Sequence, residues 1–315
     1  EEEMVGPKME LFQKPERKRK QNEIYQKAMS IQEVHSQLPI SHEVALLGHQ
    51  KAIQALALDS SGTRLISGGL DFLLKMWDLS TMNKKLRSFK EFKPFDGHPV
   101  TALDFSNDDQ NILICCANHS AKVLTRDGGK VQVTIRGDQY ISDVAQTKGH
   151  VASITDGKFH PVEDKYFLTS SVDGSVRLWD LESKAVGVDQ QLMQQVVLKP
   201  RNERGLKVAV ISCSFSPYAQ YIGGGCSDGS VQVWDARLKK FHRPVHLLDS
   251  AHERGTEVSC VQFFEDELRM VSRGLDDTMK LWDLRKAATP VHVWPDLTNL
   301  SSKTNICLSP NESLV

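Results

Sequence analysis

The sequence predicts an all-β propeller, in which a unit of four short strands is repeated to give a series of blades. The first observation is a Trp-Asp pair that closes an apolar run four times, at Trp77, Trp179, Trp234 and Trp282. The second is a Gly-His or Ala-His pair upstream, with its histidine at His49, His98, His150 and His252. The third is that the short apolar or alternating runs between these pairs are separated by Ser, Asp, Asn, Gly and Pro, which is typical of strands joined by turns.

Composition excludes several classes of function. The 315 residues are enough for several blades in one domain. Hydrophobic residues make up 40% and charged residues 25%, as in chains that fold. The net charge of -1 argues against binding polyanions over the whole surface and leaves only local basic patches. No apolar run approaches the ~18 residues that a membrane-spanning helix needs.

The sequence also gives no sign of a metal site or an active site. None of the 6 cysteines forms a Cys-x-x-Cys pair or has a histidine at zinc-site spacing. Most lie in apolar runs, as Cys115 and Cys116 do, which favours reduced core thiols in an intracellular protein. There is no glycine-rich phosphate loop and no nucleophile motif. We therefore expect no metal, no cofactor, no small-molecule substrate and no catalytic residue.

The repeat gives five units and the start of a sixth. Unit one ends at Trp77; unit two is degenerate, opens at Gly97-His98 and has Leu124 in the place of the tryptophan. Units three, four and five end at Trp179, Trp234 and Trp282. A sixth unit begins at 305–310. Repetition of this pattern at roughly 40–55 residues is the signature of the WD40 repeat, with four strands in each blade.

Four residues of each unit are expected to hydrogen-bond in series across the blade: a His, a Ser or Thr, an Asp and a Trp. A buried His or Asp is costly unless it is paired, so the set appears whole or is lost together. Complete sets are His49, Ser67, Asp71 and Trp77; His150, Thr169, Asp173 and Trp179; and His252, Ser272, Asp276 and Trp282. Unit four lacks the His and has Gly224 at the hydroxyl position, where unit two has Ile114. We interpret the complete sets as structural rather than as ligands or bases.

The two ends differ from the repeats. Residues 1–38 are expected to form a flexible basic extension, with a basic run at 17–20 and a short helix near 23–32. The basic run is either a nuclear-import or nucleic-acid patch, or part of a solvated linker. Residues 39–315 are expected to form the propeller, with an outermost strand at 43–47.

The propeller is expected to be incomplete at its C-terminal side. A complete propeller of this repeat usually has seven blades, and this chain supplies about five and a half. An open arc would expose the apolar faces of its end blades. We therefore expect the natural protein to continue for roughly 60–90 residues or more.

A basic loop occupies the place where unit four has lost its Gly-His pair. The sequence of this loop contains four basic residues and one acidic residue, Glu203. The basic residues are Lys199, Arg201, Arg204 and Lys207. One interpretation is a contact with an acidic or phosphate-bearing partner, including peripheral RNA. The alternative is a solvated loop.

Several stretches of the sequence are more specific than the WD40 repeat itself. They include Gly-Asp-Gln-Tyr-Ile at 137–141 and Thr-Lys-Gly-His at 147–150. Further stretches are Ser-His-Glu at 41–43, Lys-Pro-Arg at 199–201, and the segments 229–235 and 273–285. With these stretches the chain resembles, over about residues 40–315, the WD repeat-containing protein 70 family of WD40 proteins, also called gastrulation-defective homologues.

The resemblance implies a non-catalytic, nuclear, seven-bladed propeller with flexible flanks. Members of the family are linked to late spliceosomal complexes and to the cullin-4 ubiquitin ligase. An adaptor of that ligase docks on receptors with Trp-Asp-x-Arg after the third strand of a blade. This motif ends here at Arg237 and at Arg285, so Arg237, Asp283 and Arg285 are candidate partner-binding residues. The alternative is a rim arginine paired locally.

Taken together, we expect a non-enzymatic nuclear scaffold for protein–protein contacts in a spliceosomal assembly of pre-mRNA splicing. The first alternative is a substrate receptor of a cullin-4 ubiquitin ligase in the chromatin and DNA-damage response. The second is a small-ligand or enzymatic propeller, which the lack of an acid–base constellation outside the blade tetrads disfavours.

Overall fold

The computed structural model describes residues 43–82, 86–129, 131–141, 143–144, 146–184, 191–238, 243–309 and 312. The chain divides into two units, Glu1–Leu46 and Leu47–Val315. All the strands among the described residues lie in the second unit. The predicted extension at 1–38, with its basic run and short helix, lies outside the described residues. In the described part no helix is both long enough and apolar enough to cross a membrane.

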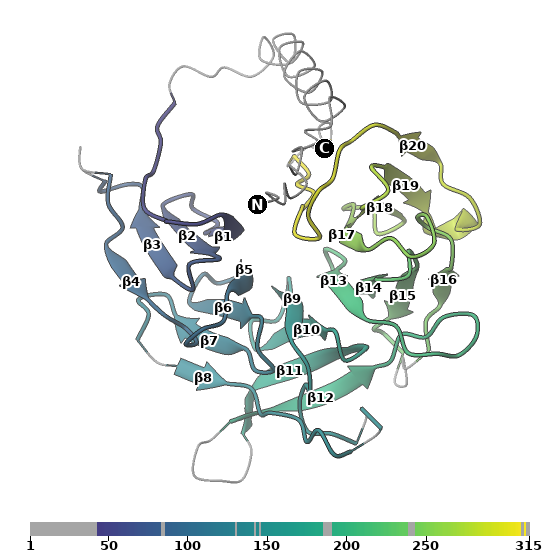
Figure 1. Ribbon diagram of the computed structural model, residues 1–315, viewed down its shortest axis with the longest axis horizontal. Helices are drawn as coiled ribbons and strands as arrows, with labels where there is room; N and C mark the ends of the chain where they lie inside the picture. The colour runs from purple at the N-terminus through teal and green to yellow at the C-terminus, as the bar shows by residue number, and fades with distance from the viewer. Residues whose placement is uncertain are drawn as a thin grey trace, which may run out of the picture. The chain divides into compact units, whose positions relative to one another are not determined.

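Five four-stranded antiparallel sheets follow one another along the second unit (Figure 1). The first is β1 (Ile53–Leu58), β2 (Arg64–Gly69), β3 (Leu74–Asp78) and β4 (Lys90–Phe92). The second is β5 (Val100–Phe105), β6 (Asn111–Cys116), β7 (Lys122–Thr125) and β8 (Val131–Val133). The third is β9 (Ile154–Phe159), β10 (Tyr166–Ser171), β11 (Ser175–Lys184) and β12 (Leu192–Leu198). The fourth is β13 (Val210–Phe215), β14 (Tyr221–Cys226), β15 (Val231–Asp235) and β16 (His246–Leu248). The fifth is β17 (Val258–Phe263), β18 (Arg269–Gly274), β19 (Met279–Asp283) and β20 (His292–Trp294), with a short 3-10 turn at Leu284–Lys286.

This arrangement confirms the predicted all-β propeller blades. Each sheet runs in chain order, and its first strand contacts the first strand of the next sheet (Figure 1). Apolar side chains fill the space between neighbouring blades: Ile66 and Met76 of blade one form one buried cluster with Leu103 and Ile114 of blade two. The degenerate second unit therefore still forms a complete blade, because its apolar alternation survives even though its polar set does not.

Neighbouring blades are also joined through the turns between their first and second strands. A carboxylate in the turn of one blade accepts a backbone N–H from the turn of the preceding blade. The pairs are Ser60 N with Asp109, Asp108 N with Asp164, Tyr218 N with Glu267, and Glu265 N with Glu312. The first three distances are 3.1, 3.0 and 2.8 Å. The fourth pair places Glu312 where the turn of a next blade would lie.

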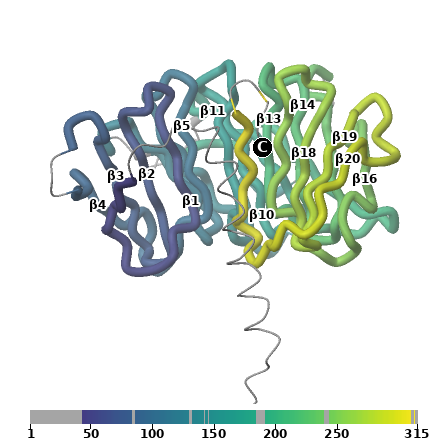
Figure 2. Tube along the Cα trace, turned by 90° about the horizontal axis from the view of Figure 1, so that it is seen from above, coloured from purple at the N-terminus to yellow at the C-terminus, as the bar shows by residue number. Residues whose placement is uncertain are grey.

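Residues 304–309 pass beside the first strand of blade five, where the first strand of a next blade would lie, but they form no strand. Cys213 N of β13 donates to Asp156 of β9 at 3.1 Å, and Ile306 N donates to Cys260 Sγ of β17 at 3.4 Å. Ile306 and Leu308 pack on the apolar face of blade five. Figure 1 shows this stretch in yellow passing beside β17, and Figure 2 shows the same yellow segment from above. The sixth unit that was expected to begin at 305–310 therefore forms no strand over its described residues, 305–309. Contacts between blades are face to face, so no hydrogen-bond ladder reaches this segment.

The strand predicted at 43–47 is also wrong. Residues 43–49 carry no strand in the structure. A strand is stabilised by a paired neighbour, and each of the five sheets is already completed by four strands of its own unit. The apolar run that suggested the strand therefore has no ladder to join.

Candidate functional site

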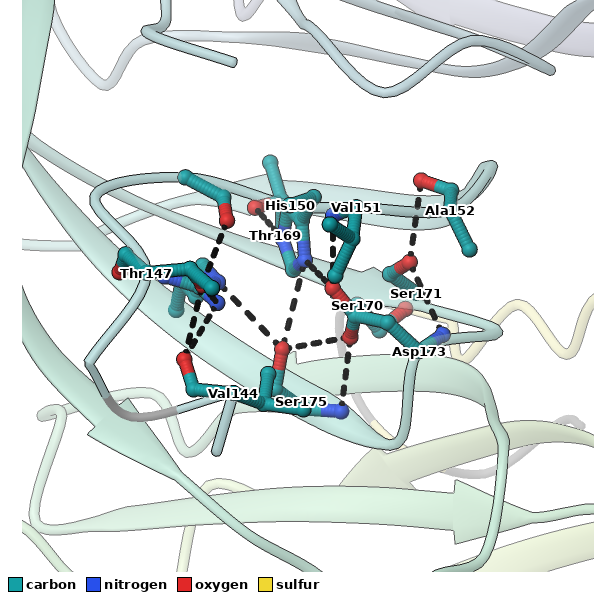
Figure 3. A network of polar contacts seen from close by, with 12 residues as sticks. Val144, Thr147, His150, Val151, Ala152, Thr169, Ser170, Ser171, Asp173 and Ser175 are labelled. Carbon is teal, nitrogen blue, oxygen red and sulfur yellow. Dashed lines mark hydrogen bonds and ion pairs between the residues drawn. The ribbon is translucent and has the colours of Figure 1, made fainter. Parts of the chain in front are cut away.

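The polar set of blade three forms a continuous hydrogen-bonded chain, and Figure 3 labels its members His150, Thr169 and Asp173. Trp179 Nε1 donates to Thr169 Oγ1 at 2.7 Å, and Thr169 Oγ1 lies 2.8 Å from His150 Nε2. His150 Nδ1 lies 2.9 Å from Asp173 Oδ2. A neutral imidazole with its proton on Nδ1 satisfies every link, because Nε2 then accepts from the Thr169 hydroxyl. All four side chains are buried.

The same geometry recurs in blades one and five. The Trp-to-Ser distances are both 2.9 Å, for Trp77 to Ser67 and Trp282 to Ser272. The Ser-to-His distances are 2.7 and 2.8 Å, and the shortest His-to-Asp distances are both 2.9 Å. Each Asp also accepts the backbone N–H that follows the histidine, as Asp173 does from Val151 N at 3.1 Å. Each set therefore ties the loop entering a blade to the turn between its second and third strands.

Burial determines the protonation of these sets. It lowers the pKa of His150 and His252, although Asp173 and Asp276 act in the opposite direction. Burial disfavours the ionised form of Asp173, but hydrogen bonds from His150 and Ser175 outweigh it and hold its pKa at about 2. In blades three and five the folded protein therefore keeps the imidazoles of His150 and His252 neutral against ionised carboxylates at neutral pH.

These shifts predict a loss of stability in mild acid. The histidines of the unfolded chain titrate near 6.5, whereas the folded-state pKa values of His150 and His252 are lower. As pH falls through about 6.5, the unfolded chain takes up protons that the folded chain does not, so the free energy of unfolding decreases. We expect a lower melting temperature at about pH 5.5 than at about pH 7.5. A melting temperature equal at both values would contradict neutral buried histidines.

Blade four shows what is lost when the set decays. Trp234 is fully buried, and no hydrogen-bond partner reaches its Nε1 within the described residues. Gly224 occupies the place of the hydroxyl, and a Cβ built there would lie 3.1 Å from the Trp234 ring. The blade therefore retains the tryptophan for packing alone.

Restoring the hydroxyl is expected to stabilise blade four. Gly224→Ser places a hydroxyl at the position of Ser67 and Ser272, and the ring atoms of Trp234 nearest to that position are Cζ3 and Cη2. The indole must therefore turn before Nε1 meets the hydroxyl, and a gain below about 1 kcal/mol in the free energy of unfolding is expected. Gly224→Ala is the matched control, because it adds the same Cβ and restricts the backbone without supplying an acceptor. Urea denaturation of the two variants measures the difference. Equal stability of serine and alanine would show that no bond forms.

Sequence reasoning missed a buried arginine beside the blade-three set. Arg177 is fully buried, and burial lowers its pKa to about 10, although Asp173 opposes that shift. It donates to Val144 O at 2.8 Å, Thr147 O at 3.0 Å and Thr147 Oγ1 at 2.7 Å, and it also contacts Gln194. The signal was present: the residue two before each tryptophan, or before Leu124, is long and polar in every unit, namely Lys75, Lys122, Arg177, Gln232 and Lys280.

The basic loop at 199–207 is compensated more than its sequence suggests. Lys199 pairs with Asp143 at 2.9 Å. Arg204 lines a surface pocket of about 230 Å³ together with the carboxylates of Glu203, Asp228 and Asp249. Arg201 and Lys207 are exposed and form an antiparallel bridge across the loop through their backbones. The count that set four basic residues against Glu203 alone misses Asp143, Asp228 and Asp249, which the fold brings in from other segments.

The two candidate rim arginines are held by the aspartates two residues before them. Arg285 donates through Nε and Nη2 to both oxygens of Asp283, at 3.0 and 2.7 Å. Arg237 binds Asp235 in the same way and also contacts Gln220 and Tyr221. The hydrogen bonds from Arg285 lower the pKa of Asp283 to about 2. The Arg285 side chain remains 66% exposed, so its guanidinium is oriented and still open to solvent.

The chemical capacity of the described residues is that of a binding surface. Their buried histidines, His150 and His252, are used in the blade sets. No group of three or more potential metal ligands occurs among the described residues. The buried thiols are inactive as nucleophiles, because burial raises the pKa of Cys116 and of Cys226 to about 12. What the blades present to a partner is a set of loops and turns held in fixed positions.

Comparison with known proteins supports this description. The family model for the WD domain, G-beta repeat, matches residues 41–78, 89–124, 141–180, 204–235 and 243–283. The chain is 40% identical to the gastrulation defective protein 1 homolog of Drosophila melanogaster over 90% of its length. It is 39% and 36% identical to WD repeat-containing protein 70 of Xenopus tropicalis and Homo sapiens, in each case over 88% of its length. The resemblance predicted from the sequence is thus confirmed. The chain spans less than half of these relatives, 42%, 43% and 41% of their respective lengths.

Proposed function

Because the chain belongs to the WD40-repeat family, we propose that it acts as a non-enzymatic nuclear scaffold for protein partners within a spliceosomal assembly of pre-mRNA splicing. WD40 domains generally mediate contacts between proteins, which supports the role of a scaffold. The choice of assembly is supported by the similarity to WD repeat-containing protein 70, because the resemblance noted in the sequence implies a spliceosomal role.

The observation that carries the proposal is the use of polar groups in the blades. Three blades bury a His–Asp pair in a saturated hydrogen-bond chain, and in each the Asp also fixes the loop that enters the blade. Polar groups in an enzyme converge on a space for substrate. In this chain the His and Asp side chains of the blade sets hold loops rigid, which lowers the entropy cost of binding a partner.

Copurification from nuclear extract tests the proposal. The full-length protein is tagged, recovered under gentle conditions and compared with a sample in which Asp173→Ala disrupts blade three. Enrichment of spliceosomal proteins that depends on intact blades is the expected result. Recovery of the protein without any spliceosomal component, or its exclusion from the nucleus, would contradict the proposal.

A second candidate function, the substrate receptor of a cullin-4 ubiquitin ligase, is favoured by the two rim arginines. Arg237 and Arg285 lie on adjacent blades, and each is held in plane by a bidentate contact with its aspartate. A planar, oriented guanidinium suits recognition of a carboxylate or a carbonyl on a docking protein. Arg285 is the stronger candidate, because Arg237 is additionally engaged by Gln220 and Tyr221.

The two candidates are separated by the double variant Arg237→Ala and Arg285→Ala. As a ligase receptor, the protein would lose its cullin adaptor in copurification while its spliceosomal partners remain. Retention of the adaptor by the double variant would remove the support that these arginines give. The control is Arg269→Ala, since Arg269 is also a partly exposed arginine paired with a nearby carboxylate, Asp266.

A further inference from the structure

We propose that the surface pocket between the loops entering blades four and five binds a basic side chain, arginine or lysine, of a partner protein. This inference rests on the proposed function as a protein scaffold and adds a site and a partner chemistry to it. Four observations carry it. The aspartate of blade four has no internal partner, the walls of the pocket are fixed, carboxylates dominate its charge, and a guanidinium of the chain already pairs with one of them.

The pocket has a volume of about 230 Å³ and is lined by three segments of the chain. These are residues of 202–206, in the loop entering blade four, Asp228 of the turn between β14 and β15, and residues of 249–255, in the loop entering blade five. Small-molecule sites usually have ~300–1,000 Å³. The pocket therefore suits one side chain better than a whole small molecule.

Asp228 lacks the partner that its counterparts have. In blades one, three and five the aspartate of this turn pairs with a histidine of the entering loop, as Asp173 does with His150 at 2.9 Å. Among the described residues, Asp228 accepts only from its own turn, from Ser230 N at 3.0 Å and Ser230 Oγ at 2.6 Å, both through Oδ1. Three equivalent turns thus hold a nitrogen group from the entering loop where blade four supplies none.

Leu206 occupies the place of the missing histidine. It precedes β13 by the same four residues by which His150 precedes β9, but its side chain is 59% exposed and lines the pocket. The pocket therefore combines carboxylates with an aliphatic wall. Lysine and arginine side chains have the same division, with an apolar stem and a charged end, so they match the pocket in both parts.

Hydrogen bonds fix the wall that the loop entering blade four supplies. Asn202 Oδ1 accepts from Arg204 N at 3.0 Å and from Leu206 N at 2.9 Å, which holds these residues in a turn. Gln232 is fully buried, and its Nε2 donates to Arg201 O at 2.9 Å. This wall is therefore attached to the strand beneath it.

The opposite wall rests on the turn of blade four. His252 N donates to Gly229 O at 2.9 Å, and Gly255 N donates to Asp228 O at 3.0 Å. The contact is so close that a Cβ on Gly229 would lie 2.5 Å from Glu253 O. Because both walls are already ordered, a ligand binds without the entropy cost of ordering them.

Carboxylates dominate the charge of the pocket although two arginines line it. The carboxylates of Glu203, Asp228 and Asp249 outnumber the guanidinium groups of Arg204 and Arg254. Burial, followed by the charges of Glu203 and Asp228, raises the pKa of Asp249, and the opposing effect of Arg254 is smaller. A cation that enters beside Asp249 is therefore stabilised.

One of these arginines shows that the pocket accepts a guanidinium. Arg254 Nη2 lies 3.7 Å from Glu203 Oε2, so this pair joins the two walls. The two side chains are 73% and 58% exposed. An ion pair so exposed stabilises the fold little, so a cation of a partner can replace Arg254 at Glu203.

The sequence of the loop entering blade four predicts the opposite ligand, an acidic or phosphate-bearing one. That prediction counts Lys199, which Asp143 pairs with at 2.9 Å, and it omits Asp228 and Asp249, which come from other segments. At the pocket itself the charges brought together by the fold favour a basic ligand.

The test measures binding of labelled peptides to the full chain. The probe is a fluorescein-labelled peptide in which arginine alternates with leucine and serine. A second peptide has lysine at the arginine positions, and a third has citrulline, the uncharged analogue of arginine. We expect the basic peptides to bind, and Asp228→Asn and Asp249→Asn each to weaken them about fivefold, as the loss of one ion pair does. Asp228→Asn keeps an oxygen that accepts from Ser230, so the turn is preserved.

Two further variants give a result that a purely structural role would not produce. Arg204→Gln and Arg254→Gln each remove a cation that competes with the ligand for the carboxylates. Each is expected to strengthen binding of the arginine peptide about twofold. If both variants weaken binding instead, the arginines hold the peptide and the inference is wrong.

The matched pair of controls is Glu203→Gln and Glu163→Gln. Glu163 also forms an exposed ion pair at 3.7 Å, with Lys165, and it lies between β9 and β10, at the opposite end of a blade from the entering loops. Glu203→Gln should weaken the peptide, Glu163→Gln should not, and all variants should melt at the same temperature. The inference is wrong if neither basic peptide binds, if the citrulline peptide binds equally well, or if the carboxylate variants have no effect.

Calcium chloride serves as the competing ligand, with sodium chloride of equal ionic strength as its reference. If calcium displaces the arginine peptide and sodium does not, the pocket is a metal site and the inference is wrong. Copurification separates failure here from failure of the proposed function. If Asp249→Asn retains its peptide affinity while spliceosomal partners are recovered, only this site is refuted. If no partners are recovered with the unchanged protein, the scaffold itself is refuted.

Discussion

Replacing Asp173 by alanine is expected to lower the free energy of unfolding by about 3 kcal/mol. Its carboxylate accepts from His150 Nδ1, Val151 N, Ser175 N and Ser175 Oγ, at 2.6 to 3.1 Å. Alanine leaves a buried imidazole and a backbone N–H without an acceptor, and each such loss costs on the order of 1–3 kcal/mol. Urea denaturation at neutral pH measures the change, with a lower midpoint and an unchanged slope expected.

Asp228→Ala is the control for this prediction. Asp228 occupies the equivalent turn of blade four, where the histidine is missing, and it accepts from Ser230 N and Ser230 Oγ. It is only half-buried, so its loss is expected to cost about 1 kcal/mol. If the two alanine variants are equally destabilised, the hydrogen-bond chain through His150 contributes nothing beyond a local turn.

Arg177→Met is expected to cost about as much, roughly 3 kcal/mol, and to loosen one loop selectively. Methionine keeps much of the buried side-chain volume but removes every hydrogen bond from the guanidinium. Val144 O keeps the Thr147 hydroxyl and Thr147 O keeps Gln194 as donors, so the loop is weakened rather than released. Amide hydrogen exchange should accelerate more at residues 143–150 than in the corresponding loops of the other blades.

The matched change in blade one is Lys75→Met. Lys75 stands at the same place before its tryptophan, but it pairs with Glu91, whose side chain is 45% exposed. Water can therefore replace that partner, and a loss of about 1 kcal/mol or less is expected. Equal losses for the lysine and arginine variants would mean that Arg177 is an ordinary blade residue rather than the anchor of the loop.

The blades could be predicted from the sequence because their determinants are periodic. Turns and apolar runs recur at roughly 40–55 residues, in most units with the Trp-Asp pair. The weak signals of the five units therefore support the same fold. The hydrogen-bonded sets could be predicted from the same repeat, because the Asp of each set precedes its Trp by the same number of residues, as Asp173 precedes Trp179. Even the lost acceptor of Trp234 could be anticipated, because Gly224 stands where a hydroxyl belongs.

The features that could not be predicted depend on side-chain contacts that lie outside the repeated pattern. Lys199 meets Asp143 from a different unit, so the count of charges along one loop was misleading. In the sequence Arg177 looks like an ordinary polar residue of a strand. Its burial could not be predicted, because it depends on the length and path of the preceding loop. The strand expected at 43–47 failed for a similar reason, because apolar alternation indicates that a strand is possible and not that a partner is available.

The carboxylates that join the turns have a consequence for synthesis on the ribosome. Each accepts a donor from the preceding blade, and the joined residues are 49, 56, 49 and 47 positions apart. At roughly 5–20 residues per second, a turn waits several seconds before its acceptor is translated. Limited proteolysis of ribosome-arrested chains that stop before or after Asp164 would detect the change in protection of the turn at Asp108. The newest blade is therefore always the least protected one, and the growing chain carries a single vulnerable end that advances by one blade at a time.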